Sequence, residues 1–121
     1  MTTFDAGEPL EGGWVLEGTD GESNPVRLVF GETELAQAYL GLTVGRHPAL
    51  CDRVIGDAGV SRRHFRFCIV EGALHLEDLN SLNGTLLDGR EIPPFQPVAV
   101  SPGQSVTLGR AALVVTRLTD V

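Results

Sequence analysis

The sequence predicts an all-β domain, either a sandwich or a barrel, of about ten or eleven strands. Apolar residues recur mostly at every second position, turn-forming residues fall every eight to twelve residues, and helix-forming segments are scarce. With 121 residues, 42% of them hydrophobic, the chain is long enough for one domain with a real core and too short for two. We expect that domain at 13–119, after a disordered acidic tail at 1–12.

The first part of the chain predicts two strands, at 14–16 and 26–30, joined by a turn at 19–22. The next segment, 32–39, leaves two alternatives open. Its Glu-Leu-Ala-Gln-Ala run fits one helical turn as well as the start of another strand.

The remaining chain alternates more regularly. Phe65, Phe67 and Ile69 alternate with less apolar neighbours and should form the core face of one strand, and Leu74 and Leu76 should point inward from the next. Further strands are predicted at 42–44, 85–87, 98–100, 106–108 and 112–118, with tight turns at 71–72, 83–84, 88–89 and 102–103.

The charge distribution favours a locally presented anion over a polyanion. The formal net charge of −7 argues against nucleic-acid binding, which requires clustered cations. Yet the segment 46–66 has a net charge of +3, because five of the nine arginines outnumber Asp52 and Asp57 there, and the remainder carries −10. A solvated surface could also explain these arginines, which are Arg46, Arg53, Arg62, Arg63 and Arg66. Nine arginines without any lysine indicate a GC-rich bacterial genome.

Two cysteines, Cys51 and Cys68, are too few for a disulfide scaffold and lack a metal-binding spacing. We interpret both as free thiols, with Cys68 in the core and Cys51 in a loop. No apolar run approaches the roughly 20 residues of a membrane helix, and the acidic N-terminus does not resemble a secretion signal. We therefore expect a cytoplasmic protein with no membrane contact, no metal and no cofactor.

Three polar elements stand out against this strand-forming background: Gly45-Arg46, the run 61–64 (SRRH) and the run 80–85 (NSLNGT). They fall at predicted strand ends and loops, where a rigid β-scaffold can bring distant residues together. A guanidinium can hold two phosphate oxygens at once, and serine hydroxyl and asparagine amide groups can donate further hydrogen bonds to the ligand. The elements therefore predict a phosphate-binding site, provided that their loops converge.

These elements resemble the forkhead-associated (FHA) domain, a phosphothreonine-recognition module. The resemblance runs from about Trp14 to Leu118, and its signatures lie in order at 42–46 (LTVGR), 60–65 (VSRRHF), 78–85 (DLNSLNGT) and 98–109 (VAVSPGQSVTLG). The resemblance implies an eleven-stranded antiparallel β-sandwich of the FHA/SMAD type. It also implies a threonine-phosphorylated partner protein and an upstream Ser/Thr protein kinase.

Matched position by position, the resemblance implies that Arg46 and Ser61 contact the phosphate. Arg62 and Asn83 would hold the peptide backbone beside the phosphothreonine. Structural support of the site is implied for the remaining matched residues, Gly45, His64, Gly84 and Thr85.

One position departs from the family pattern. Many members have Thr or Ser immediately before the asparagine, where this chain has Leu82, so only the backbone N–H could donate to the phosphate there. The loss of one hydrogen bond should weaken binding by about 1–2 kcal/mol without abolishing it. Arg53 or Arg63 could compensate, although the family pattern assigns neither to the phosphate.

Two other functional classes deserve comparison. An enzyme has little support, since Ser61 and His64 should lie on opposite sides of the chain and no nucleotide loop or carboxylate pair is present. A degenerate family member could instead act as a phosphate-independent scaffold or secretion-apparatus component. Arg46 and Ser61 argue against that alternative and Leu82 argues weakly for it. We expect a monomeric, non-catalytic phosphothreonine-binding adaptor in kinase-dependent signalling or regulated assembly.

Overall fold

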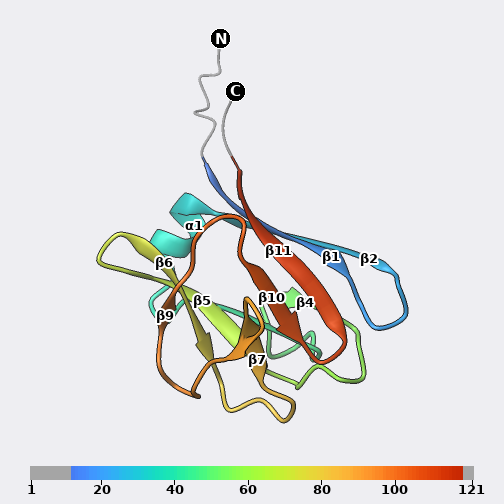
Figure 1. Cartoon of the computed structure of the whole chain (residues 1–121). Coiled ribbons are helices and arrows are strands. Elements are labelled where there is room, and N and C mark those ends of the chain that lie inside the picture. Colours follow the sequence, from blue (N-terminus) through green and yellow to red (C-terminus); the bar gives the residue numbers. More distant parts are fainter. Residues whose placement is uncertain (1–11, 119–121) are drawn as a thin grey trace.

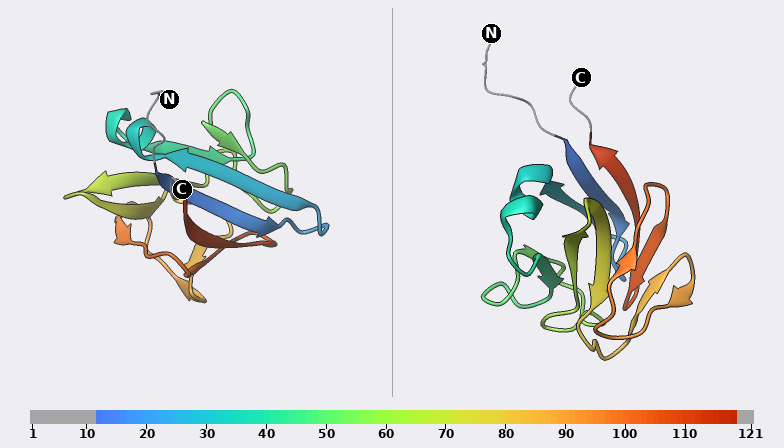
Figure 2. Two further views of the ribbon diagram at one scale, coloured as in Figure 1. Left: turned by 90° about the horizontal axis from the view of Figure 1, so that it is seen from above. Right: turned by 90° about the vertical axis from the view of Figure 1, so that its left-hand side faces the viewer.

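Two β-sheets face each other as two layers, with one short helix beside them, in the computed structural model, which describes residues 12–118 (Figures 1 and 2). The eleven strands confirm the predicted all-β sandwich. The first sheet has the order β2-β1-β11-β10-β7-β8, and the second β4-β3-β5-β6-β9. The tail expected at 1–12 lies, except for Gly12, outside the described residues.

The strands of the first sheet are β1 (Gly13–Thr19), β2 (Pro25–Gly31), β7 (Thr85–Leu87), β8 (Arg90–Glu91), β10 (Ser105–Leu108) and β11 (Ala111–Leu118). Those of the second are β3 (Leu42–Gly45), β4 (Arg53–Val54), β5 (Phe65–Val70), β6 (Ala73–Asp78) and β9 (Val98–Ala99). Neighbouring strands pair antiparallel, except for the short parallel pair of β3 and β4. In the first sheet, β1 and β11 pair from Gly13↔Leu118 to Thr19↔Ala112.

The core lies between the two layers, where alternate residues of each strand point inward. Phe30 of β2 and Phe67 of β5 meet edge to face across it, with ring centroids 4.9 Å apart. Phe65, Phe67, Leu74 and Leu76 are buried as predicted, whereas Ile69 is only half-buried.

Cys68 is half-buried and does not belong to the core, so its predicted position was wrong. It lies between Phe67 and Ile69 on β5, and strict alternation places its side chain on the outer face with Arg66. Cys51 lies in the loop between β3 and β4, as predicted, and both thiols are free.

The ambiguous segment forms a helix, α1 (Glu32–Gln37). Glu32 and Glu34 fall in its first turn, where negative charge is favourable, and Leu35 is its one buried residue. The Glu32 N–H donates to the carbonyl of Gly12, which fixes the helix beside the start of β1. Within residues 12–118, no helix is long and apolar enough to span a bilayer.

Three loops gather at the end of the sandwich away from Gly13 and Leu118 (Figure 1). They connect β3 to β4, β4 to β5, and β6 to β7. All three polar elements of the sequence lie on these loops or at the strand ends beside them.

Candidate functional site

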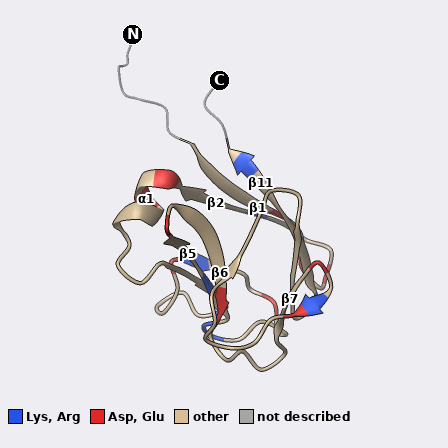
Figure 3. Cartoon of the chain, turned by 60° about the vertical axis from the view of Figure 1, so that its left-hand side comes forward, with Lys and Arg blue, Asp and Glu red and all other residues tan. Residues whose placement is uncertain are grey.

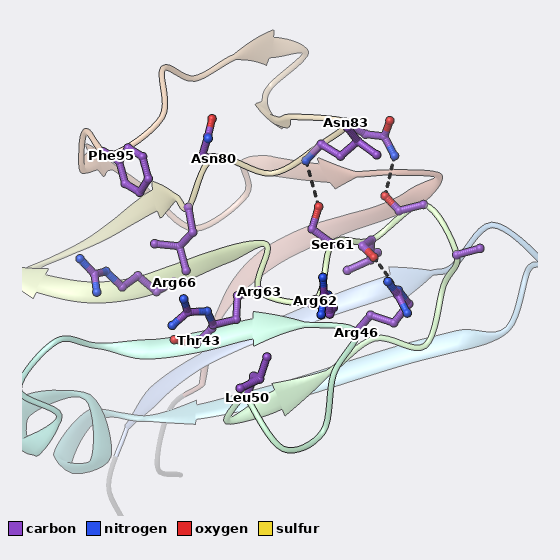
Figure 4. A pocket seen from close by; sticks show the side chains of 15 residues that line it. Thr43, Arg46, Leu50, Ser61, Arg62, Arg63, Arg66, Asn80, Asn83 and Phe95 are labelled. Carbon is purple, nitrogen blue, oxygen red and sulfur yellow. Dashed lines mark hydrogen bonds between the residues drawn. The ribbon is translucent and has the colours of Figure 1, made fainter.

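An open groove of about 760 Å³ lies between the β3–β4, β4–β5 and β6–β7 loops and the outer face of the second sheet. Its lining includes four arginines and no acidic residue: Arg46, Arg62, Arg63 and Arg66 (Figure 4). Figure 3 shows the corresponding blue segments on β5 and next to it. The acidic chain therefore presents one concave basic surface, which suits an anionic ligand.

Arg46 is held by its own backbone and side chain. Its N–H donates to the carbonyl of Ser61 at 2.9 Å, and its Nε donates to the carbonyl of Val60 at 2.9 Å (Figure 4). These bonds orient the guanidinium plane and leave the two terminal nitrogens available. A pair of terminal nitrogens matches two oxygens of a phosphate.

Ser61 lies at the start of the segment that leads into β5 and contacts the β6–β7 loop. Its Oγ accepts a hydrogen bond of 2.9 Å from the Leu82 backbone N–H. The serine hydroxyl can accept and donate simultaneously, so its proton remains available to a ligand. The Leu82 side chain projects into solvent, with 89% of its surface exposed.

Arg62 and Asn83 line the groove from two different loops, β4–β5 and β6–β7. The Arg62 side chain is exposed and makes no hydrogen bond or ion pair within the described part of the chain. The Asn83 Nδ2 donates to the carbonyl of Gly59 at 2.8 Å, which ties the β6–β7 loop to the β4–β5 loop. Its Oδ1 is left to accept a hydrogen bond, as a peptide N–H would require.

His64 is fully buried and contacts both the β4–β5 loop and the β6–β7 loop. Its Nδ1 accepts a hydrogen bond of 3.0 Å from the Ser61 N–H, so the proton of the neutral ring is on Nε2, which donates to the Gly84 carbonyl at 2.9 Å. Burial lowers the pKa of His64.

The expectation that Ser61 and His64 lie on opposite sides concerned their side chains, and the observed contact joins the His64 ring only to the Ser61 backbone, which the tightly turning chain brings within reach. The imidazole contacts the backbone of Ser61, and the Ser61 hydroxyl oxygen faces Leu82 instead. The pair therefore lacks the arrangement of a nucleophile and its base.

A sequence model of the FHA domain matches residues 42–109, which contain every residue of this groove. The chain belongs to the FHA domain family.

Similar proteins agree with this family. An oxoglutarate dehydrogenase inhibitor from Corynebacterium glutamicum is 40% identical over 72 residues, which make up 60% of this chain and 48% of that protein. The glycogen accumulation regulator GarA of Mycolicibacterium smegmatis is 38% identical over 72 residues, 60% of this chain and 43% of that protein. The match thus spans less than half the length of these curated relatives.

Solved structures show the same fold. The N-terminal FHA domain of Saccharomyces cerevisiae Rad53p, in complex with a phosphothreonine peptide, has a TM-score of 0.68 at 26% identity and covers 89% of this chain and 94% of its own. An engineered FHA domain with a Myc-pTBD peptide has a TM-score of 0.71 at 25% identity, with 92% and 94% covered.

Three residues of this FHA domain shape the loops around the groove. Gly45 is in close contact with the backbone of the Arg62 loop, since a Cβ there would lie 2.8 Å from the Arg62 carbonyl carbon and closer still to its oxygen. Gly84 has φ +81°, which favours glycine. Thr85 is fully buried, and its Oγ1 donates to Asp78 Oδ1 at 2.6 Å.

Asp78 is a supporting residue that the sequence reasoning missed. Its buried carboxylate accepts hydrogen bonds from Ser81 Oγ at 2.6 Å, from the Ser81 N–H at 3.1 Å and from Thr85 Oγ1. A carboxylate followed by hydroxyls three and seven residues later was a visible signal. Asp78 thereby fixes both ends of the β6–β7 loop.

Asp57 has the corresponding role in the β4–β5 loop. Its buried carboxylate accepts hydrogen bonds from the Gly59 N–H at 2.8 Å and from the Gly21 N–H at 2.5 Å. The first bond closes a local turn, and the second attaches that turn to the β1–β2 loop.

Arg53, which the sequence grouped with the basic segment, does not line the groove. Its Nε donates to the Val29 carbonyl at 2.9 Å, its Nη2 pairs with Glu34 Oε1 at 2.5 Å, and its guanidinium lies 5.3 Å from the centre of the Phe30 ring. Arg53 therefore fastens β4 to β2 and α1 and lies outside the groove, so its position does not fit the compensating role expected for it.

Proposed function

We propose that this FHA domain is a non-catalytic adaptor that binds a partner protein phosphorylated on threonine by a Ser/Thr kinase. It would act in the cytoplasm as a monomer, in signalling or regulated assembly. The observation that carries the proposal is the shared groove: three separate segments of the sequence bring Arg46, Ser61, Arg62 and Asn83 to one basic cavity. The phosphothreonine peptide bound to the Rad53p domain supports the same ligand class.

In this proposal, the terminal nitrogens of Arg46 and the hydroxyl of Ser61 hold the phosphate. The Leu82 N–H contributes indirectly, because it fixes the Ser61 oxygen and so directs the hydroxyl proton toward the groove. Arg62 and Asn83 hold the peptide backbone next to the phosphothreonine. No reaction follows, since each group only donates or accepts hydrogen bonds.

Titration of degenerate phosphothreonine peptide libraries against wild type and Arg46→Ala tests this function. We expect micromolar binding by the wild type and a loss of about 100-fold in the variant, because a bidentate, charge-assisted contact disappears. Phosphoserine and unphosphorylated libraries report the selectivity for threonine and the requirement for phosphate.

The matched control is Arg90→Ala, which removes an exposed arginine of β8 outside the groove and should leave binding unchanged. An equal loss in both variants would indicate a general charge effect and contradict the assigned site. Binding that ignores phosphorylation in wild type would overturn the proposal in favour of a phosphate-independent scaffold.

A further inference from the structure

We propose that Arg63 and Arg66 form a second anion subsite in the groove, which takes a second acidic group of the bound phosphopeptide, either a carboxylate or a phosphate. This inference rests on the proposed function and specifies its ligand more narrowly. The preferred partner would then carry an acidic or phosphorylated residue near its phosphothreonine.

The first argument is charge balance. Four guanidinium groups line the groove and one acid, Glu77, pairs with one of them. Three positive charges thus remain without an acid in contact, within the described residues. One phosphothreonine brings a charge of only about −1.5 to −2. A second anion on the same peptide would complete the neutralisation.

The second argument is the position of the two arginines. Arg66 pairs with Thr43 in the ladder of β3 and β5, and both side chains line the groove from the outer face of the second sheet. Figure 4 shows Arg63 and Arg66 toward this end, beside Thr43, whereas Arg46 and Arg62 lie toward the other end, beside Ser61. The groove therefore has a basic region separate from the phosphate-binding residues.

The third argument is preorganisation. The Nε and Nη2 of Arg66 both lie 3.0 Å from Oε1 of buried Glu77, which fixes the guanidinium and leaves its Nη1 without a partner among the described residues. Arg63 is exposed and makes no hydrogen bond or ion pair anywhere in 12–118. The fixed guanidinium of Arg66 can bind an anion with little loss of conformational entropy. The exposed Arg63 side chain can then move to contact the same anion.

The fourth argument is the apolar wall beside these arginines. Phe95 lines the groove with 61% of its surface exposed, in the left-handed region at φ +62°, which is unfavourable for a bulky residue. Its N–H donates to the Asp78 carbonyl at 2.8 Å, which helps to hold that conformation. Such strained residues cluster at ligand sites, and this ring can cover the aliphatic stem of an acidic side chain.

A peptide series tests the second subsite. The host is the tightest phosphothreonine peptide from the library, with one flanking position at a time set to Ala, Glu or phosphoserine, and affinity is measured by fluorescence anisotropy. At one position we expect Glu to bind about fivefold tighter than Ala, as for an ion pair near a protein surface. A greater gain with phosphoserine than with Glu would identify phosphate as the second group, and the reverse order would identify a carboxylate.

Two variants and a control assign the effect. Arg63→Gln should lower the Glu-to-Ala preference from about fivefold to at most about twofold, because only Arg66 then remains to hold the carboxylate. The preference is a ratio of two affinities of the same variant, so a general loss of affinity from the removed charge cancels out. Arg90→Gln, with the same charge change outside the groove, should retain the preference. Glu77→Gln, which releases the charge of Arg66 but keeps an oxygen for it to bond, should increase the preference.

The outcomes separate the two proposals. If the wild type shows no phosphate-dependent binding, both the phosphothreonine function and this subsite are overturned. Phosphothreonine binding without any acidic preference, or with a preference that Arg63→Gln leaves intact, would overturn the second subsite alone. An unchanged preference in Glu77→Gln would exclude Arg66 from it.

Discussion

The Leu82 backbone N–H donates to the Ser61 hydroxyl oxygen at 2.9 Å, which links the two loops that face the groove. One member of this pair carries the hydroxyl assigned to the phosphate, and the other occupies the position where many FHA domains have Thr or Ser. The structure thus uses a backbone group to orient a side-chain group. A second hydroxyl is missing, and the side chain in its place is exposed.

Leu82→Thr should therefore strengthen binding of a phosphothreonine peptide. The added hydroxyl can donate one further charge-assisted bond, worth about 1–2 kcal/mol or roughly 5- to 30-fold in affinity. The control is Leu82→Val, which has nearly the shape of threonine without its hydroxyl. Equal affinities of the two variants, measured by calorimetry, would contradict a phosphate position beside residue 82.

Gly45→Ala should displace the loop that carries Arg62. The new Cβ would overlap the Arg62 carbonyl, and the strain should cost about 1–3 kcal/mol of unfolding free energy and weaken the peptide affinity as well. Gly56→Ala is the matched control, because a Cβ at that exposed position meets no atom within 4 Å. Urea unfolding and peptide titration of both variants check the prediction, which fails if Gly45→Ala behaves like Gly56→Ala.

Asp78→Asn should destabilise the domain by about 1–3 kcal/mol, because an amide cannot accept all the hydrogen bonds that converge on this buried carboxylate. The β6–β7 loop would loosen, and phosphopeptide affinity should fall with it. Glu71→Gln removes an exposed charge at the β5–β6 turn and should have no effect on either quantity. Thermal unfolding distinguishes the two, and equal melting temperatures would show that Asp78 is dispensable.

His64 should make stability depend on pH. Because burial lowers the pKa of His64 below the value of about 6.5 in an unfolded chain, the unfolded state binds the proton first as the pH falls. The stabilisation from neutral His64 is therefore complete above about pH 6.5 and is lost progressively below it. Lowered pKa values of the exposed Asp20 and Asp88 act only near pH 4 and below, outside this window.

Urea unfolding between pH 8 and 5.5 measures this loss, and His75→Gln should retain it because His75 lies outside the loop contacts. Nitrogen-15 NMR should find the His64 ring neutral at pH 7, with its proton on Nε2. A His64 that titrates at or above pH 6.5 in the folded protein would contradict the prediction.

The alternation of apolar residues was sufficient to predict most strands, because a half-buried strand leaves a period of two in the sequence. Phe65 and Phe67 illustrate it, since both are buried on the core face of β5. For α1 the signal was too short, with Leu35 as its one buried residue. Cys68 was misplaced because the apolar character of a thiol was given more weight than the alternation that set its face.

The groove residues were predictable through the family signatures, because Arg46, Ser61, Arg62 and Asn83 occupy signature positions that contact the ligand in the family. Their support was less predictable, because it depends on contacts between distant segments. Asp57 reaches the β1–β2 loop, and Arg53 turns away to Glu34. Only the folded chain shows that four of the five clustered arginines line the groove and that the fifth does not.

The pairing of Gly13 with Leu118 has a mechanical consequence. A force that pulls these two residues apart acts on the antiparallel β1–β11 ladder from one end, so its hydrogen bonds open one after another, like a zipper, and do not share the load. Low forces should therefore suffice to peel β1 from β11. The groove lies at the opposite end of the sandwich (Figure 1), so β1 and β11 would separate near Gly13 and Leu118 well before the strain reaches the groove loops.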